Sequence, residues 1–362
     1  MTKEPMAEPT TVEKCINQGT INYRKGDISK AIENFLRALT IDPNNAAAHF
    51  GLGNSYYVQK EWEKAIKYYT NSLKINPQAA SIWSNLGIVF LELGEIKKAK
   101  EAFAKAIEIK PDYAPSWYNL ARLYENVDAD KAIETYQKAL QLNPNYTSVQ
   151  YNLGLLYYNR GKFNEAIEYY EKALESDPHH SKAWINLGVV WRELGEINKA
   201  ISTYERAVET LLEHPRLWFA LGNLYYERGL ENDLINAITS YSKGLELAPD
   251  EASAWSDLGS VYYKIGDLDT AITNFQRALT VDPKYFKAWF NLGNVYYKKY
   301  LEEAVLEDDV PEYKSYALWC FHKGTELGDK DSLHNEQTLL KQGVEAKEPP
   351  LFTEDRSDVG DQ

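Results

Sequence analysis

A proline recurs along this chain at an almost constant interval. The successive steps are 34, 34, 33, 34, 71 and 34 residues, between Pro43, Pro77, Pro111, Pro144, Pro178, Pro249 and Pro283. Self-similarity at such a period is typical of arrays in which one small unit is stacked many times. The period therefore predicts a repeat protein in place of a single globular core.

Each unit carries the pattern of two amphipathic helices. Counting from the start of each unit, tryptophan or a substitute holds position 4, leucine position 7, glycine or alanine position 8 and, from the second unit on, an aromatic residue position 11. Alanine then holds position 20, an aromatic ring position 24 and a small residue position 27. Spacings of three, four and seven place these side chains on one face of each helix. Glycine inside a helix costs about 1 kcal/mol relative to alanine, so its recurrence at position 8 indicates close packing. The pattern predicts an all-α stack of antiparallel helical hairpins.

At these residues the chain resembles the tetratricopeptide repeat family. The pattern W-x-x-L-G-x-x-Y…A-x-x-x-F-x-x-A…P matches eight times between Val12 and Tyr285, and a ninth, altered copy starts at Phe286. The units start near residues 12, 46, 80, 114, 147, 181, 215, 252 and 286. The resemblance implies a right-handed superhelical solenoid whose first helices line a concave groove and whose second helices face outward.

The flanking segments and the irregular units give the expected boundaries. We expect a disordered N-terminus over residues 1–11, the repeat array over 12–330, a capping helix over 331–344 and a disordered acidic tail over 345–362. The fourth unit lacks one residue near 126–130, the seventh gains about three near 230–234, and the ninth carries an acidic insertion over 302–312. Cys15, Gln18 and Asn22 give the first unit a polar edge that suits an end repeat.

Composition and motifs exclude several classes of function. A net charge of −13 opposes binding to a phosphate backbone, and no apolar run approaches the length of a membrane helix. Two distant cysteines exclude a disulfide framework and a cysteine zinc site. No catalytic or nucleotide-binding motif occurs, and the polar N-terminus lacks a secretory signal. We therefore expect a cytoplasmic protein that is not an enzyme and holds no cofactor or metal.

Asparagine recurs on the face of the first helix that points away from the packed positions. A side-chain amide both donates and accepts, so a row of them could hold the backbone of an extended peptide, as a similar ladder does in the peptide-recognising portion of the O-GlcNAc transferases. The alternative is that the amides hydrogen-bond a neighbouring hairpin. The candidates at position 6 are Asn17, Asn85, Asn119, Asn152, Asn186 and Asn291, and those at position 9 are Asn54, Asn223 and Asn294.

Aromatic residues form further rows on the same face. Tyrosine offers rigid contact area with a polar tip, which suits recognition, although such rings can also pack sideways against the next hairpin. The candidates at position 12 are Tyr23, Tyr57, Tyr158, Tyr226, Tyr263 and Tyr297, and position 5 adds Phe50, Tyr118, Tyr151, Phe219 and Phe290.

The charge of this face differs in sign from that of the whole chain. Its basic residues are Arg24, Arg122, Lys182, Arg192, Arg216, Lys264, Lys287 and Lys298, and its acidic residues are Glu13, Glu92, Glu125, Glu193, Glu227 and Asp257. Six of the basic and three of the acidic residues fall in the last four units, so we expect that half to prefer an acidic segment. The acidic tail either occupies this surface or only keeps the protein soluble.

The sequence favours a scaffold or adaptor that binds an extended protein segment. A receptor for chaperone carboxylates is disfavoured, because Phe50 and Pro115 replace its basic residues and Asp257 would repel the ligand. Two alternatives stay open: a regulatory or targeting subunit of an enzyme complex, and a self-assembling structural protein that forms homo-oligomers.

Overall fold

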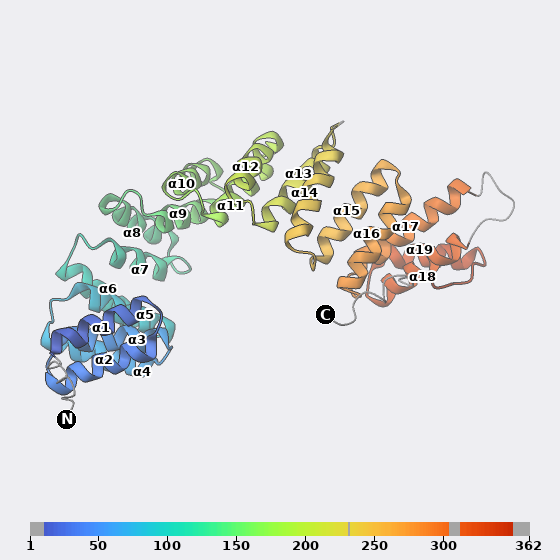
Figure 1. Cartoon of the computed structure of the whole chain (residues 1–362). Coiled ribbons are helices and arrows are strands. Elements are labelled where there is room, and N and C mark those ends of the chain that lie inside the picture. Colours follow the sequence, from blue (N-terminus) through green and yellow to red (C-terminus); the bar gives the residue numbers. More distant parts are fainter. Residues whose placement is uncertain (1–10, 231, 304–311, 350–362) are drawn as a thin grey trace, which may run out of the picture. The chain divides into compact units, whose positions relative to one another are not determined.

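The computed structural model describes residues 11–230, 232–303 and 312–349, and every regular element among them is an α-helix (Figure 1). The expected all-α array of helical hairpins is confirmed. The helices are α1 Val12–Arg24, α2 Ile28–Ile41, α3 Ala46–Val58, α4 Trp62–Ile75, α5 Ala80–Glu92, α6 Ile96–Ile109, α7 Ala114–Tyr124, α8 Ala129–Leu142, α9 Thr147–Asn159, α10 Phe163–Ser176, α11 Ser181–Glu193, α12 Ile197–Thr210, α13 Pro215–Arg228, α14 Asp233–Leu247, α15 Ala252–Ile265, α16 Leu268–Val281, α17 Phe286–Glu303, α18 Tyr313–Glu326 and α19 Lys330–Lys341.

The chain divides into two compact units, Met1–Asp177 and Pro178–Gln362, each built from stacked hairpins. In every hairpin the first helix packs along its second helix, and the second helix packs against the first helix of the following hairpin within the unit. First helices also touch directly, α1 with α3 and α5 with α7 in one unit, α13 with α15 and α15 with α17 in the other. The first helices of each unit thus present a shared surface.

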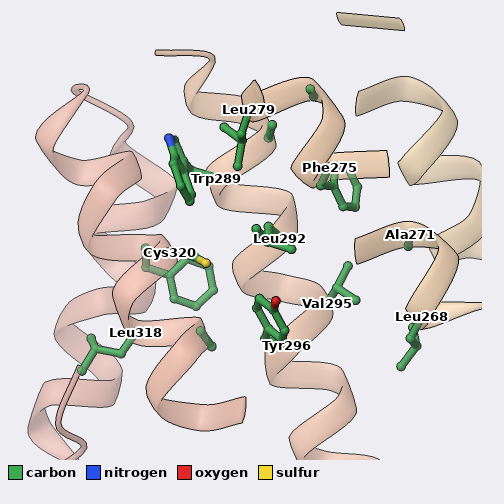
Figure 2. Close-up of a cluster of buried hydrophobic side chains, with 14 of the residues drawn as sticks. Leu268, Ala271, Phe275, Leu279, Trp289, Leu292, Val295, Tyr296, Leu318 and Cys320 are labelled. Atoms are coloured by element: carbon green, nitrogen blue, oxygen red, sulfur yellow. The ribbon is translucent and has the colours of Figure 1, made fainter. Parts of the chain in front are cut away.

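Close helix packing explains the glycine at position 8. A Cβ on Gly53 would lie 2.4 Å from the ring of Tyr69, and one on Gly87 would lie 2.5 Å from the ring of Phe103. The aromatic residue at position 24 therefore occupies the space that a side chain at position 8 would need. Figure 2 shows the equivalent core of the last hairpins, where Leu292 and Tyr296 of α17 lie beside Cys320 of α18.

In most of the described hairpins the turn contains a left-handed residue, the turn between α7 and α8 being an exception. Glycine supplies it at Gly26, Gly94 and Gly161 with φ of 82°, 72° and 68°. Lys60, with φ of 59°, is the one non-glycine residue with positive φ in the described part of the chain. The regular turn keeps the two helices of each hairpin antiparallel.

The three added residues of the seventh unit lie in the turn between α13 and α14. Arg228 donates from Nε and Nη2 to the two carboxylate oxygens of Asp233 at 2.8 and 2.6 Å. The backbone N–H of Leu230 donates to the same carboxylate at 2.9 Å. Since Asp233 is 2% exposed, this buried pair closes the longer turn.

The ends of the chain are described only in part. Residues 1–10, residues 350–362 and most of the acidic insertion lie outside the described residues. Of the three residues expected to form a polar N-terminal edge, Cys15 and Asn22 are buried and Gln18 is exposed. Helix α19 packs on α18. None of the described helices is long and apolar enough to cross a membrane.

Candidate binding surface of the first helices

The position 6 and position 9 asparagines are joined by hydrogen bonds between hairpins. The Tyr69 hydroxyl on α4 donates to Asn54 Oδ1 on α3 at 2.7 Å. Asn85 Nδ2 on α5 donates to the same oxygen at 3.1 Å. Burial raises the pKa of Tyr69, which keeps its phenol protonated and able to donate. One acceptor therefore links three successive helices.

A second bridge of the same kind uses a carboxylate. The Tyr136 hydroxyl on α8 donates to Glu125 Oε1 just after α7, and Asn152 Nδ2 on α9 donates to the Tyr136 hydroxyl at 2.9 Å. Burial and the Glu125 carboxylate raise the pKa of Tyr136. Asn119, which was expected on an open face, is 6% exposed.

The second compact unit repeats the arrangement. The Tyr241 hydroxyl on α14 donates to Asn223 Oδ1 on α13, Asn291 Nδ2 reaches Ser260 Oγ at 3.5 Å, and Asn335 Nδ2 reaches Asn294 Oδ1 at 3.4 Å. The alternative that these amides hydrogen-bond the fold therefore applies to Asn54, Asn85, Asn152 and Asn223, and Asn119 is buried. Asn17 is exposed, and Asn186 is half-buried.

Asp257 stands at position 6 of the eighth unit, where other units hold asparagine. A carboxylate cannot donate as Asn85 does to Asn54, and Asp257 is half-buried on α15. Burial raises the pKa of Asp257 to about 6, which the positive charge of Lys287 partly opposes. The group therefore titrates close to neutral pH.

The position 12 tyrosines are all half-buried. The ring of Tyr57 lies 5.6 Å from that of Trp62, and the ring of Tyr158 lies 5.9 Å from that of Phe163. Tyr23 contacts the core of the first hairpins, and Tyr297 lies 6.1 Å from Tyr300. Each of these rings keeps one exposed part while the rest supports the fold.

The position 5 rings pack inside their own hairpins. The distance between ring centres is 6.1 Å for Phe50 and Tyr69, and 5.9 Å for Tyr118 and Tyr136. Tyr151 lies 5.9 Å from Tyr170, Phe290 lies 6.1 Å from Phe321, and Phe219 covers Gly244. These contacts place the row inside its own hairpins, whereas the alternative had such rings packed against the next hairpin.

Position 12 of one first helix meets position 13 of the next. Within the second unit, Lys264 Nζ of α15 lies 4.7 Å from the ring centre of Tyr226 on α13, and Lys298 Nζ of α17 lies 4.9 Å from that of Tyr263 on α15. At the same register, Arg192 Nε of α11 donates to Glu227 of α13 at 2.7 Å. The two lysine–tyrosine contacts, on α13, α15 and α17, are called the cation ladder below, and the Arg192–Glu227 pair extends the same register to α11.

The remaining basic candidates of the second unit are exposed on the same helices. Lys182 lies on α11, Arg216 on α13 and Lys287 on α17. The first compact unit differs at the equivalent register, because the Glu92 carboxylate there, together with burial, raises the pKa of Tyr57. The structure therefore brings six basic candidates together on the first helices of the second unit.

From the second unit on, a hydrogen bond that the sequence analysis did not predict joins the position 4 side chain to the preceding unit. The indole N–H of Trp83 donates to the carbonyl of Pro77 at 3.0 Å, and that of Trp117 donates to Pro111 at 2.8 Å. The feature of the sequence that could have predicted this bond is the constant spacing of six residues from proline to tryptophan. The same bond is made by Trp184, Trp218, Trp255 and Trp289, by His49 and by Gln150.

The start of the expected tail lies against the last hairpin. The Lys347 N–H donates to the carbonyl of Ser315 near the start of α18, and Lys347 Nζ pairs with Glu312. The described residues therefore place Lys347 beside the start of α18.

Comparison with protein families matches repeats of one type along most of the array. A family described as TPR repeat matches residues 19–60, 53–94, 128–161, 231–266 and 259–299. Families described as tetratricopeptide repeat match residues 80–113, 102–133 and 151–211. A comparison with curated proteins gives no match.

Several solved structures of repeat proteins are similar to parts of the chain. YrrB, described as a TPR protein with an unusual peptide-binding site, is 27% identical, with a TM-score of 0.44 over 52% of this chain and 96% of YrrB. MamA is 30% identical, with a TM-score of 0.40 over 45% of this chain and 96% of MamA. A tetratricopeptide repeat protein from Parabacteroides merdae is 18% identical, with a TM-score of 0.47 over 69% of this chain and 98% of that protein.

Proposed function

Because the chain belongs to the tetratricopeptide repeat family, we propose that it is a non-enzymatic protein-interaction scaffold whose first helices bind an extended peptide segment. We further propose that the first helices of the second compact unit take an acidic segment. The observation that carries this proposal is the cation ladder, which consists of Lys264 over Tyr226 and Lys298 over Tyr263.

The ladder supports an acidic ligand because a tyrosine ring holds each of its lysines in place, and the exposed ion pair of Lys298 with Glu302, at 3.9 Å, neutralises its charge only in part. A lysine over a tyrosine ring keeps its full charge and its three donors, while the ring restricts where the ammonium group lies. Two such pairs recur on neighbouring first helices, so carboxylates along an extended chain could meet them in succession. Carboxylate–ammonium hydrogen bonds are stronger than neutral ones.

The acidic residues of this surface weaken its positive charge only in part. Glu227 is paired with Arg192, and the raised pKa of Asp257 leaves a fraction of that group neutral near pH 6. The remaining cations give a positive surface on a chain whose net charge is −13. A surface of opposite sign attracts an acidic segment and disfavours a basic one.

The asparagines keep part of their hydrogen-bonding capacity for a peptide backbone. A side-chain amide has two N–H donors and an oxygen with two lone pairs. Asn85 uses one N–H toward Asn54, so its own oxygen remains for a backbone N–H of the ligand. The proposed role is therefore shared, with one side of the amide bound to the fold and the other facing the peptide.

The proposal is tested by measuring fluorescence anisotropy with two labelled peptides on the intact chain, one alternating glutamate with serine and the other lysine with serine. We expect the acidic peptide to bind and its affinity to fall as salt rises, because the charges are exposed. Replacing Lys264, Lys287 and Lys298 together with glutamine should weaken binding by about tenfold or more.

A matched variant controls for net charge. It replaces three lysines on second helices of the same unit, Lys199, Lys243 and Lys323, with glutamine. This variant should bind the acidic peptide almost as the unchanged chain does. Equal losses in the two variants, or tighter binding of the basic peptide, would overturn the proposal.

A further inference from the structure

An open pocket lies between the turn that joins α8 to α9 and the end of α10, away from the candidate binding surface. Its volume is about 340 Å³, and its lining residues are Pro144, Asn145, Gln150, Lys172, Glu175 and Ser176. This volume is at the lower end of the range for ligand pockets. Gln150 stands two residues before Asn152 on α9, so it points to a nearly opposite side of that helix.

The other repeats show what normally fills this place. Position 4 is tryptophan in six units, and its indole N–H donates to the carbonyl six residues earlier. In two of these units a basic side chain from the second helix covers the ring: Arg206 lies 5.2 Å from the ring centre of Trp184, and Lys243 lies 4.5 Å from that of Trp218. In the fifth unit the equivalent basic residue is Lys172, which lines the pocket.

Gln150 makes the same hydrogen bond as the position 4 tryptophans, but it has no ring to fill the space beside that bond. Its Nε2 donates to the carbonyl of Pro144 at 2.8 Å, as the tryptophans do to theirs. The side chain is 4% exposed, and its Oε1 is buried without a hydrogen-bond partner. A buried acceptor without a donor is unfavourable, so this oxygen favours a ligand that brings an N–H or O–H group.

We propose that this pocket is a second binding site, which takes the indole side chain of a tryptophan from a partner polypeptide. The ring takes the place that a position 4 tryptophan fills in other repeats, and its N–H donates to Gln150 Oε1. The aliphatic stem of Lys172 covers one face of the ring. The chain's own tryptophans are already engaged: those at position 4 donate to the carbonyls six residues before them, Trp62 lies against Tyr57, Lys199 covers Trp191, and Trp319 packs on Trp289. The ligand therefore comes from another protein.

The first test uses indole and N-methylindole as probes on the full chain, with binding followed by saturation-transfer NMR. Indole should bind, and N-methylindole, which lacks the donor, should bind up to about tenfold more weakly. A blocked tripeptide Gly-Trp-Gly should bind like indole, whereas Gly-Phe-Gly should not. Equal binding of indole and N-methylindole would overturn the role of Gln150 Oε1.

Two variants locate the site. Gln150→Trp fills the pocket with the chain's own ring and should abolish indole binding while raising the melting temperature. Trp83→Gln recreates the arrangement in the third unit, with Pro77 and Lys105 in the equivalent positions, and should add a second indole site. Indole binding that survives Gln150→Trp would overturn the proposal, and Trp83→Gln without added binding would show that a glutamine at position 4 does not make the site.

Discussion

Single amides in this chain serve the fold at positions that we propose to face a ligand. Asn54 Oδ1 accepts from both Tyr69 and Asn85, so its removal leaves the hydroxyl of a buried tyrosine without the acceptor it donates to. We expect Asn54→Ala to lower the free energy of unfolding by about 1–3 kcal/mol in urea titrations. Tyr69→Phe in the same chain should recover part of the loss, because it removes the orphaned hydroxyl.

The control for that prediction is Asn17→Ala. Asn17 is exposed at the start of the array, so its replacement should change the free energy of unfolding by less than about 0.5 kcal/mol. If Asn54→Ala and Asn17→Ala unfold at the same urea concentration, the hydrogen-bonded network does not stabilise the fold.

Asp257 makes the free energy of unfolding depend on pH. Its pKa in the folded chain is about 6, above the value of about 4 for an unfolded aspartate, so the folded state binds the proton more tightly. The stability that this group contributes is therefore full below pH 4 and is lost as pH rises through 6. Asp257→Asn should be more stable than the unchanged chain at pH 8, by about 1–3 kcal/mol.

Urea unfolding at a series of pH values checks this expectation. The difference between Asp257→Asn and the unchanged chain should shrink through pH 6 and vanish near pH 4. A difference that stays constant from pH 4 to pH 8 would show that Asp257 titrates normally in the folded chain.

At the scale of helices and turns, a buried ion pair and an exposed one can be compared. Asp233 is 2% exposed and receives both the guanidinium of Arg228 and a backbone N–H, and these hydrogen bonds lower its pKa. Asp233→Ala should cost about 3 kcal/mol, because it leaves Arg228 partly buried without its partner. Since the pKa is lowered, this contribution is present above pH 4 and is lost as pH falls below it.

Glu227 provides the matched comparison. Its pair with Arg192 also involves α13, but both side chains are more than a third exposed. Glu227→Ala should cost less than about 1 kcal/mol, and less again at high salt. Thermal and urea unfolding of the two variants measures the contrast. Similar losses would mean that the longer turn after α13 does not depend on its buried pair.

The sequence predicted the elements well because their signal is repeated. Eight copies of one pattern predict helices and turns that a single copy would leave ambiguous. The glycine at position 8 correctly indicated close packing, and the structure shows that an aromatic ring of the second helix fills the space. The surface was harder to predict, because periodicity tells which side of a helix a residue faces and nothing about its neighbours on other hairpins. The Tyr69–Asn54–Asn85 bridge and the pocket beside Gln150 both depend on such neighbours.

For the whole molecule, stacking implies that each hairpin is stabilised mainly by the hairpins beside it. Trp184 and Leu187 of α11 are 4% and 3% exposed. Replacing either with alanine should cost about 3–5 kcal/mol and divide unfolding into separate transitions for the repeats before and after the sixth unit. Hydrogen exchange along the chain should show two levels of protection, and one shared transition would contradict the expectation.

The bond from each position 4 side chain to the carbonyl six residues before it also bears on how the length of the chain can change. In most units that carbonyl belongs to a proline, and the segment from the residue after one of these prolines through the next proline forms one complete structural module. Without residues 78–111, Pro77 would directly precede Asp112, and Trp117 would again stand six residues after a proline. The junction would keep its hydrogen bond and its turn, so the array can lose or gain whole hairpins as modules, whereas a change of a few residues disturbs every contact at that junction.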